Sequence, residues 1–302
     1  MSNSSHNIYR SLHKPNFCSP SNEKLKYSCF TKNALINIAK TYNNSNSSST
    51  KIKLNSNKQV LHKNISERLY NICDNEHCWI SNKNPELEKK TFRPNKPCSW
   101  YDNSNTWLNS NDISNVMSQY ETAFNNFKFV GVFPIDFFKQ TSLNQCISQE
   151  MCNLNIETMY NSKRNKIGVI YNLDKHDESG SHWVSMYICL DPNNVNYGIY
   201  YYDSAISGIP KEIKTFMNYV SNIMKNITLK KNIKRKFLVK ANKKQHQFKN
   251  TECGMFSMYF ILQCLEDKNV INDIYNSNIT DDHVFKFRDI YFKPNLNCSN
   301  IP

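Results

Sequence analysis

The sequence predicts an α+β protein with a central mixed β-sheet flanked by helices. Two observations predict this class. From about Phe127 onward, short apolar and aromatic runs alternate with loops rich in Asp, Asn, Gly and Ser, which is typical of strands. Before that point, apolar residues recur at helical spacing. We therefore divide the chain into a disordered polar tail (1–25), a helical N-terminal arm region (26–110) and a core domain (111–302).

Three segments at the start of the chain have helical periodicity. The first runs from Thr31 to Tyr42, with a threonine that can cap it. The second covers about Ser66 to Cys73, and the third covers about Asp112 to Asn126. The stretch from Phe92 to Trp107, which carries prolines and tryptophans, is interpreted as a connector.

The core segments alternate between strand and helix patterns. Four strands are predicted from β-branched and aromatic content, over residues 166–171, 182–190, 197–202 and 236–240. Pro210 opens an amphipathic helix. A long apolar helix is predicted to begin near Cys253, and Thr280 is expected to cap a closing helix.

Composition restricts the class of protein. With 302 residues and 39% hydrophobic content, the chain can fold around a substantial core. The sequence has no run of 18 apolar residues and no apolar stretch at its start, so we expect neither a membrane span nor secretion. The net charge of +13 predicts attraction to nucleic acid or to acidic protein. Part of that charge lies in the run from Lys230 to Lys244, which is either a solvated face or a contact for a polyanion such as DNA.

The 11 cysteines are odd in number and lack the regular spacing of a secreted disulfide scaffold. We therefore expect mostly buried thiols in a reducing compartment. Cys73 and Cys78, with His77 between them, form the one cluster of metal-ligand residue types. Structural zinc needs further ligands at short spacing, so no metal site is predicted.

Four residues in the order His182, Asp203, Gln247 and Cys253 have the types that a cysteine protease requires. The reactive species is a thiolate, which needs a base, a group that orients the base and donors for the oxyanion. His182 begins one predicted strand and Asp203 ends the next, so antiparallel pairing would bring them together. A cysteine at a helix start is also favoured as a thiolate by the helix dipole.

Other interpretations remain open on the residues alone. Gln245 and His246 compete for the donor and base roles, and spacing does not exclude either. A cysteine such as Cys253 is often simply buried, although Gly254 leaves the backbone beside it uncluttered. A basic nucleic-acid-binding protein without catalysis is the non-enzymatic alternative.

The motifs His182-Trp183, Asp203-Ser204 and Glu252-Cys253-Gly254, with Gln247 six residues before the cysteine, resemble the SUMO/ubiquitin-like-protein-specific protease family. That family includes the adenovirus protease and enzymes of large DNA viruses, among them those of the African swine fever virus and giant-virus type. The resemblance covers about residues 127–290. It implies a papain-like cysteine peptidase core.

The resemblance implies His182 as base, Asp203 as its orienting partner, Cys253 as nucleophile and Gln247 as oxyanion donor. Trp183 would line the channel for a Gly-Gly-like sequence before the scissile bond, although core packing explains a tryptophan equally well. No cofactor is implied. The implied partners are viral precursor polypeptides or ubiquitin-like modifier conjugates, and the implied location is the virion and the host cytoplasm. Acetyl transfer by the same residues is a further alternative.

Overall fold

The computed structural model describes residues 17–46, 50–72, 75–80, 84–266, 270–295 and 298. It divides into two compact units, residues 1–96 with 290–300 and residues 97–289 with 301–302. The second unit therefore begins at Pro97, whereas the sequence pattern placed the start of the core domain at residue 111. Of the predicted polar tail, residues 1–16 lie outside the described residues.

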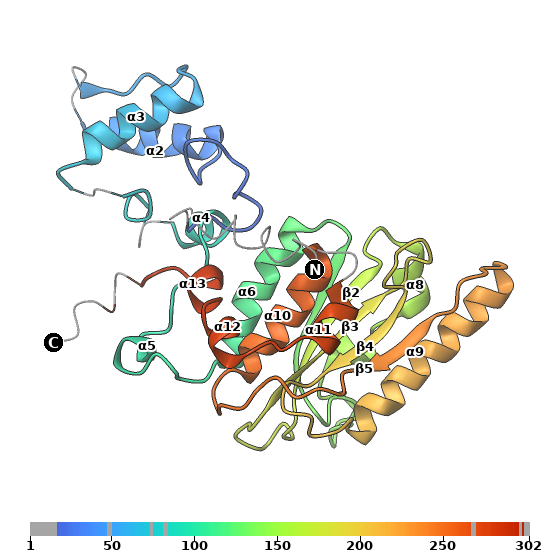
Figure 1. The fold of residues 1–302 in the computed structure, drawn as a ribbon. Coiled ribbons are helices and arrows are strands. Elements are labelled where there is room, and N and C mark those ends of the chain that lie inside the picture. Colours follow the sequence, from blue (N-terminus) through green and yellow to red (C-terminus); the bar gives the residue numbers. More distant parts are fainter. Residues whose placement is uncertain are drawn as a thin grey trace. The chain divides into compact units, whose positions relative to one another are not determined.

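The first unit is a small helical body (Figure 1). It contains α2 (Lys32–Asn44), α3 (Lys58–Leu69) and α4 (Pro85–Thr91). Thr31 caps α2 as predicted, because its hydroxyl accepts the Ala34 N–H. The predicted helix over 66–73 is wrong: the helix starts earlier, after the cap Asn57, and only Leu61 and Ile65 of α3 are buried.

The second unit contains a five-stranded mixed sheet in the order β1-β2-β3-β4-β5. Its strands are β1 (Phe127–Pro134), β2 (Lys166–Asn172), β3 (Trp183–Cys189), β4 (Gly198–Tyr202) and β5 (Leu238–Ala241). The two inner pairings are antiparallel and the two outer pairings are parallel. The strand predictions for β2, β3 and β4 are confirmed within one or two residues, and β5 begins two residues later than predicted.

Helices cover both faces of this sheet (Figure 1). On one face, alternate side chains of β3 pack into a core with α9 (Lys211–Lys230). On the other face lie α10 (Cys253–Glu266) and α6 (Ser110–Ala123), and Tyr202 of β4 stacks on Phe260 of α10 at 4.7 Å between ring centroids. The remaining helices are α5 (Ser99–Asp102), α7 (Gln149–Cys152), α8 (Ile156–Asn161), α11 (Val270–Asn276), α12 (Asp281–Phe285) and α13 (Arg288–Tyr291).

The expectation that most cysteines are free thiols is wrong. Disulfides join Cys18 to Cys29 and Cys146 to Cys152, closing short loops, and Cys78, Cys98 and Cys298 are also in disulfides. Among the described residues, the free thiols are those of Cys189, Cys253 and Cys264. Sequence spacing missed the Cys18–Cys29 and Cys146–Cys152 pairs because each joins cysteines across a local turn rather than in a repeated framework.

No helix in the described part of the chain is long and apolar enough to cross a membrane. Cys73 lies outside the described residues, and the residues that are described hold no cluster of three or more metal-ligand side chains.

Candidate active site

His182 and Asp203 meet at one edge of the sheet. Because β3 and β4 are antiparallel and Ser185 pairs with Tyr202, the residue before β3 lies beside the residue after β4. The His182 Nε2 atom is 2.8 Å from Asp203 Oδ1, within hydrogen-bond distance. Asp203 is 1% exposed and the His182 side chain is 16% exposed, so the carboxylate is shielded from solvent while the imidazole remains partly open to it.

The chain folds around the Asp203 carboxylate. Oδ1 accepts the Ala205 N–H at 2.9 Å and Oδ2 accepts the Ser207 N–H at 2.6 Å. The Asn242 side chain accepts the Asp203 N–H and donates to its carbonyl, which fixes the backbone. Burial disfavours the charged carboxylate, but the hydrogen bonds from His182 and from these backbone groups outweigh it and hold the pKa of Asp203 below its usual range.

Cys253 stands at the first position of α10 and is 2% exposed. Burial disfavours a charged imidazole, but the hydrogen bonds with Asp203 and Cys253 outweigh it and raise the pKa of His182 to about 9. Since Nε2 faces the carboxylate, Nδ1 is the ring nitrogen left for the sulfur. The arrangement places a base beside the Cys253 thiol, so a proton can pass between the two groups.

Gln247 is buried, and the fold brings it next to Ser204, which lies 43 residues earlier in the chain. Its Oε1 atom accepts the Ser204 hydroxyl at 2.7 Å, and its Nε2 atom donates to the Lys249 carbonyl at 2.7 Å. An amide nitrogen carries two protons, so one remains for another acceptor. The side chain can therefore serve as an oxyanion donor.

The structure gives His246 and Gln245 other contacts. His246 is 1% exposed, its Nδ1 atom lies 2.8 Å from the Tyr202 hydroxyl, and its ring stacks on Phe256. Burial lowers the pKa of His246, which disfavours an imidazolium. Gln245 donates to the Gln247 carbonyl at 2.8 Å. These contacts give both residues a packing or backbone-holding role.

Trp183 lines a cavity of about 530 Å³ together with Ser181 and Leu108, so the cavity reaches the residues on both sides of His182. The indole N–H of Trp183 donates to the Leu108 carbonyl at 3.0 Å. A Cβ atom at Gly254 would come within 3.2 Å of the Trp183 ring, so a glycine next to the cysteine allows this close packing. Both roles considered for Trp183 are compatible with these contacts, because the ring is 9% exposed and also lines the cavity.

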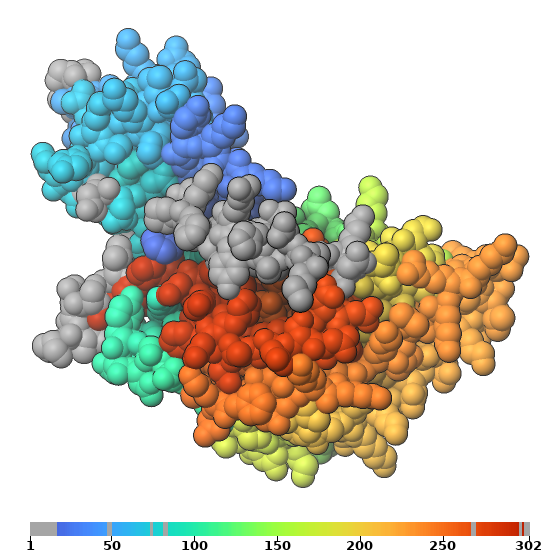
Figure 2. Space-filling model, viewed as in Figure 1, coloured from blue at the N-terminus to red at the C-terminus, as the bar shows by residue number. Residues whose placement is uncertain are grey.

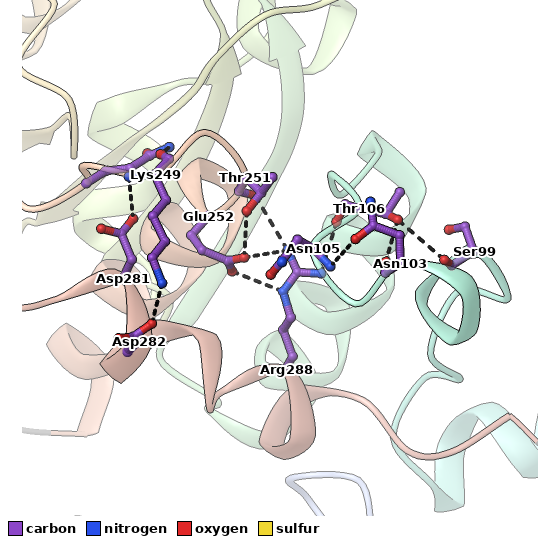
Figure 3. Close-up of polar contacts among 11 residues, drawn as sticks. Ser99, Asn103, Asn105, Thr106, Lys249, Thr251, Glu252, Asp281, Asp282 and Arg288 are labelled. Carbon is purple, nitrogen blue, oxygen red and sulfur yellow. Dashed lines mark hydrogen bonds and ion pairs between the residues drawn. The ribbon is translucent and has the colours of Figure 1, made fainter.

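Sequence reasoning missed a buried ion pair beside the cysteine. Glu252 and Arg288 are 1% and 2% exposed, and two guanidinium nitrogens donate to the two carboxylate oxygens at 3.0 and 2.9 Å (Figure 3). Arg288 also donates to the Thr106 carbonyl and lies over the Trp100 ring. It thereby ties the start of α10 to the segment before α6. The sequence signal was present, since Glu252 adjoins Cys253, but its partner is 36 residues away.

Asp281 at the start of α12 holds the segment between Gln247 and Cys253. Its carboxylate accepts the Phe248 N–H at 2.9 Å and the Lys249 N–H at 3.3 Å, and the Lys249 ammonium pairs with Asp282 (Figure 3). The prediction of a helix capped by Thr280 is confirmed. Its first residue supports the loop as well as the helix.

Comparisons with known proteins agree with this geometry. Residues 142–299 match the model of the Ulp1 protease family, C-terminal catalytic domain. A protein of Acanthamoeba polyphaga mimivirus, whose name proposes a thiol protease, is 27% identical over 92% of this chain and 93% of its own length. A protein of African swine fever virus, named SUMO-1 cysteine protease, is 30% identical over 43% of this chain and 44% of its own length.

The crystal structure of a protease from African swine fever virus superposes with a TM-score of 0.62 and 18% identity, over 93% of this chain and 97% of that one. This similarity shows that the two proteins share an α+β fold. The family model covers more than half of the chain and includes Asp203, Gln247 and Cys253. The chain belongs to the Ulp1 protease family and is a cysteine peptidase.

Proposed function

We propose that this protein is an endopeptidase in which Cys253 is the nucleophile and His182 the general base and acid. The thiolate attacks the scissile carbonyl, and the Gln247 side chain and the Cys253 N–H donate to the resulting oxyanion. Imidazolium His182 then gives its proton to the leaving amine, which leaves an acyl-enzyme. Water, deprotonated by His182, attacks the thioester and releases the product acid. The observation that carries the proposal is the 2.8 Å contact between His182 and Asp203, together with the interaction with Cys253 that helps to raise the pKa of His182.

The substrates that we propose are structural or core precursor proteins of a large DNA virus, cut after Gly-Gly-like sites during virion maturation. The supporting observations are the viral source of the relatives and the packing of Trp183 against Gly254 beside the cavity. We expect the close packing of the Trp183 ring near Gly254 to favour substrate residues without side chains. In this proposal the protein acts in the host cytoplasm at viral assembly sites and in the virion.

The test is cleavage of a peptide panel with Gly-Gly, Ala-Ala or Val-Val before the scissile bond. Wild-type protein should prefer Gly-Gly, and Cys253→Ala should lose activity by at least about 10⁴-fold, since the nucleophile is gone. Cys264→Ala is the matched control, because it removes another buried free thiol of the same helix and should keep activity. Full cleavage by Cys253→Ala would refute the proposal.

Removal of ubiquitin-like modifiers is the second candidate function. It is motivated by the relative that is named SUMO-1 cysteine protease. The discriminating measurement gives the same enzyme a folded SUMO or ubiquitin conjugate and a co-expressed viral precursor. If only the conjugate is cleaved, deconjugation is the function and precursor processing is rejected. Mass spectrometry of the products would identify the residues around the cleaved bond.

Contact with DNA is a separate part of the proposal. Figure 2 shows the surface of α9 and the segment after it, drawn in orange. Most of the charged side chains between Lys230 and Lys244 are exposed there. If this face binds DNA while the enzyme works, added DNA should change the cleavage rate at low salt and not at high salt. An unchanged rate at low salt would count against DNA contact.

A further inference from the structure

Ser204, the residue after Asp203, forms hydrogen bonds with Gln247, the candidate oxyanion donor. Ser204 is 1% exposed, and its hydroxyl donates to Gln247 Oε1 at 2.7 Å. Its carbonyl accepts the N–H groups of His246 at 2.9 Å and of Gln247 at 3.0 Å. One buried serine therefore contacts both the backbone and the side chain of Gln247.

These contacts give the Gln247 amide one orientation. The Lys249 carbonyl can only accept, so it selects the nitrogen end of the amide. The oxygen end is then left to Ser204, whose hydroxyl must donate. Reversing the amide would set a carbonyl oxygen against the Lys249 carbonyl oxygen, without a proton between them. The Lys249 end is itself fixed, because Asp281 accepts the N–H groups of Phe248 and Lys249.

We propose that Ser204 is a positioning residue that holds the Gln247 amide so that its second N–H is ready for the oxyanion. The inference rests on the proposed function, since it presumes that Gln247 donates in the transition state. Asp203 and Ser204, which follow β4 directly, then have separate roles. Asp203 orients the general base His182, and Ser204 orients the oxyanion donor Gln247.

The test compares Ser204→Ala, Gln247→Ala and the double variant, using the peptide that the wild-type protein cleaves. Loss of an oxyanion donor costs about 10²–10³-fold in kcat, so Gln247→Ala should fall in that range. Ser204→Ala keeps the amide but releases its orientation, and we expect kcat to fall about tenfold with KM unchanged. In the Gln247→Ala background, Ser204→Ala should cause little further loss, because there is no amide left to orient.

A second readout separates positioning from structural damage. Alkylation of Cys253 by iodoacetamide needs the thiolate and its imidazolium partner but forms no oxyanion. Ser204→Ala should therefore be alkylated at the wild-type rate. Ser185→Ala is the matched control: it removes a fully buried hydroxyl that has no hydrogen-bond partner among the residues that the structure describes, and it should leave kcat unchanged.

Three results would overturn the inference. Losses that multiply in the double variant would show that Ser204 and Gln247 act independently. A Ser204→Ala alkylation rate that falls together with kcat would show damage to the Cys253 and His182 pair. If Ser204→Ala keeps the wild-type kcat while Gln247→Ala is impaired, the role proposed for Ser204 is refuted and the oxyanion role of Gln247 stands.

The outcomes also separate this inference from the proposed function. Cleavage by Cys253→Ala would refute the proposed function itself. Full activity in Gln247→Ala would remove the oxyanion role and, with it, the role of Ser204. Ser204→Cys provides a second substitution of similar size if Ser204→Ala fails to fold. Because a thiol is a weak donor, the inference requires a reduced kcat there too, and a wild-type value would contradict it.

Discussion

At the scale of single residues, the candidate site depends on how Asp203 and Cys253 change the acidity of His182. The pKa of His182 is raised from its ordinary value of 6.5 to about 9, against the effect of burial. A histidine whose pKa is higher in the native state stabilises that state fully below about 6.5. This stabilisation is lost as the pH rises through about 9.

The same shift predicts the pH profile. If the thiolate–imidazolium pair is the reactive form, kcat/KM should fall on the alkaline side near pH 9, where His182 loses its proton. Asp203→Ala removes the main hydrogen bond that supports the charge, so the alkaline limb should move towards lower pH and kcat/KM at pH 7 should fall about 10²-fold. A limb that stays near 9 in Asp203→Ala would contradict this origin of the shift.

The sequence predicted the candidate catalytic residues better than it predicted the residues that hold them in place. Cys253 at a helix start and His182 and Asp203 at strand ends were all predictable, because the apolar patterns of β3, β4 and α10 are strong. Ser204 follows Asp203 directly in the sequence, but its residue type and position predict no role for it. Its contact with Gln247 depends on how residues 43 positions apart meet, which spacing along the chain does not reveal.

At the scale of elements, Arg288 connects the start of α10 with the segment before α6. The sequence predicted α10 and α12 well, since α10 is a long apolar run and α12 has a threonine cap. It did not predict the Glu252 and Arg288 pair, because burial of two charges follows from tertiary packing and contradicts the usual preference of these residues for solvent. The failed boundary of α3 has a different cause, since few residues of that helix are buried.

This buried pair predicts a specific pattern of stability. Arg288→Met leaves the Glu252 carboxylate buried without its cation, and the free energy of unfolding should fall by about 3–5 kcal/mol. Adding Glu252→Met should recover much of that loss, because no uncompensated charge remains. Urea unfolding of the single and double variants measures both values. A double variant less stable than Arg288→Met would contradict the charge argument.

At the scale of the whole molecule, a segment near the end of the sequence that includes Lys293 belongs to the first unit. Lys293 is 2% exposed, and its backbone bonds with Lys96 and Pro94 at 2.8 Å each. Its ammonium group donates to Glu88 at 3.2 Å and also contacts His77 and Asn95. Burial lowers the pKa of Lys293, and Glu88 opposes this shift. The sequence suggested a single arm region at the start of the chain and gave no sign that residues from the other end belong to it.

Lys293→Met should therefore loosen the first unit and leave the second unchanged. Losing hydrogen bonds from a charged donor costs about 1.5–3 kcal/mol each, and partial exposure of Glu88 places the expected loss near the lower value. Amide hydrogen exchange should rise over residues 17–96 and stay constant over the strands and helices of residues 97–289. Lys286→Met, which changes an exposed lysine of the second unit, should alter neither region. Equal increases in both units would show that Lys293 stabilises the whole protein. Its contacts would then not stabilise the first unit specifically, although residues 290–300 are assigned to that unit.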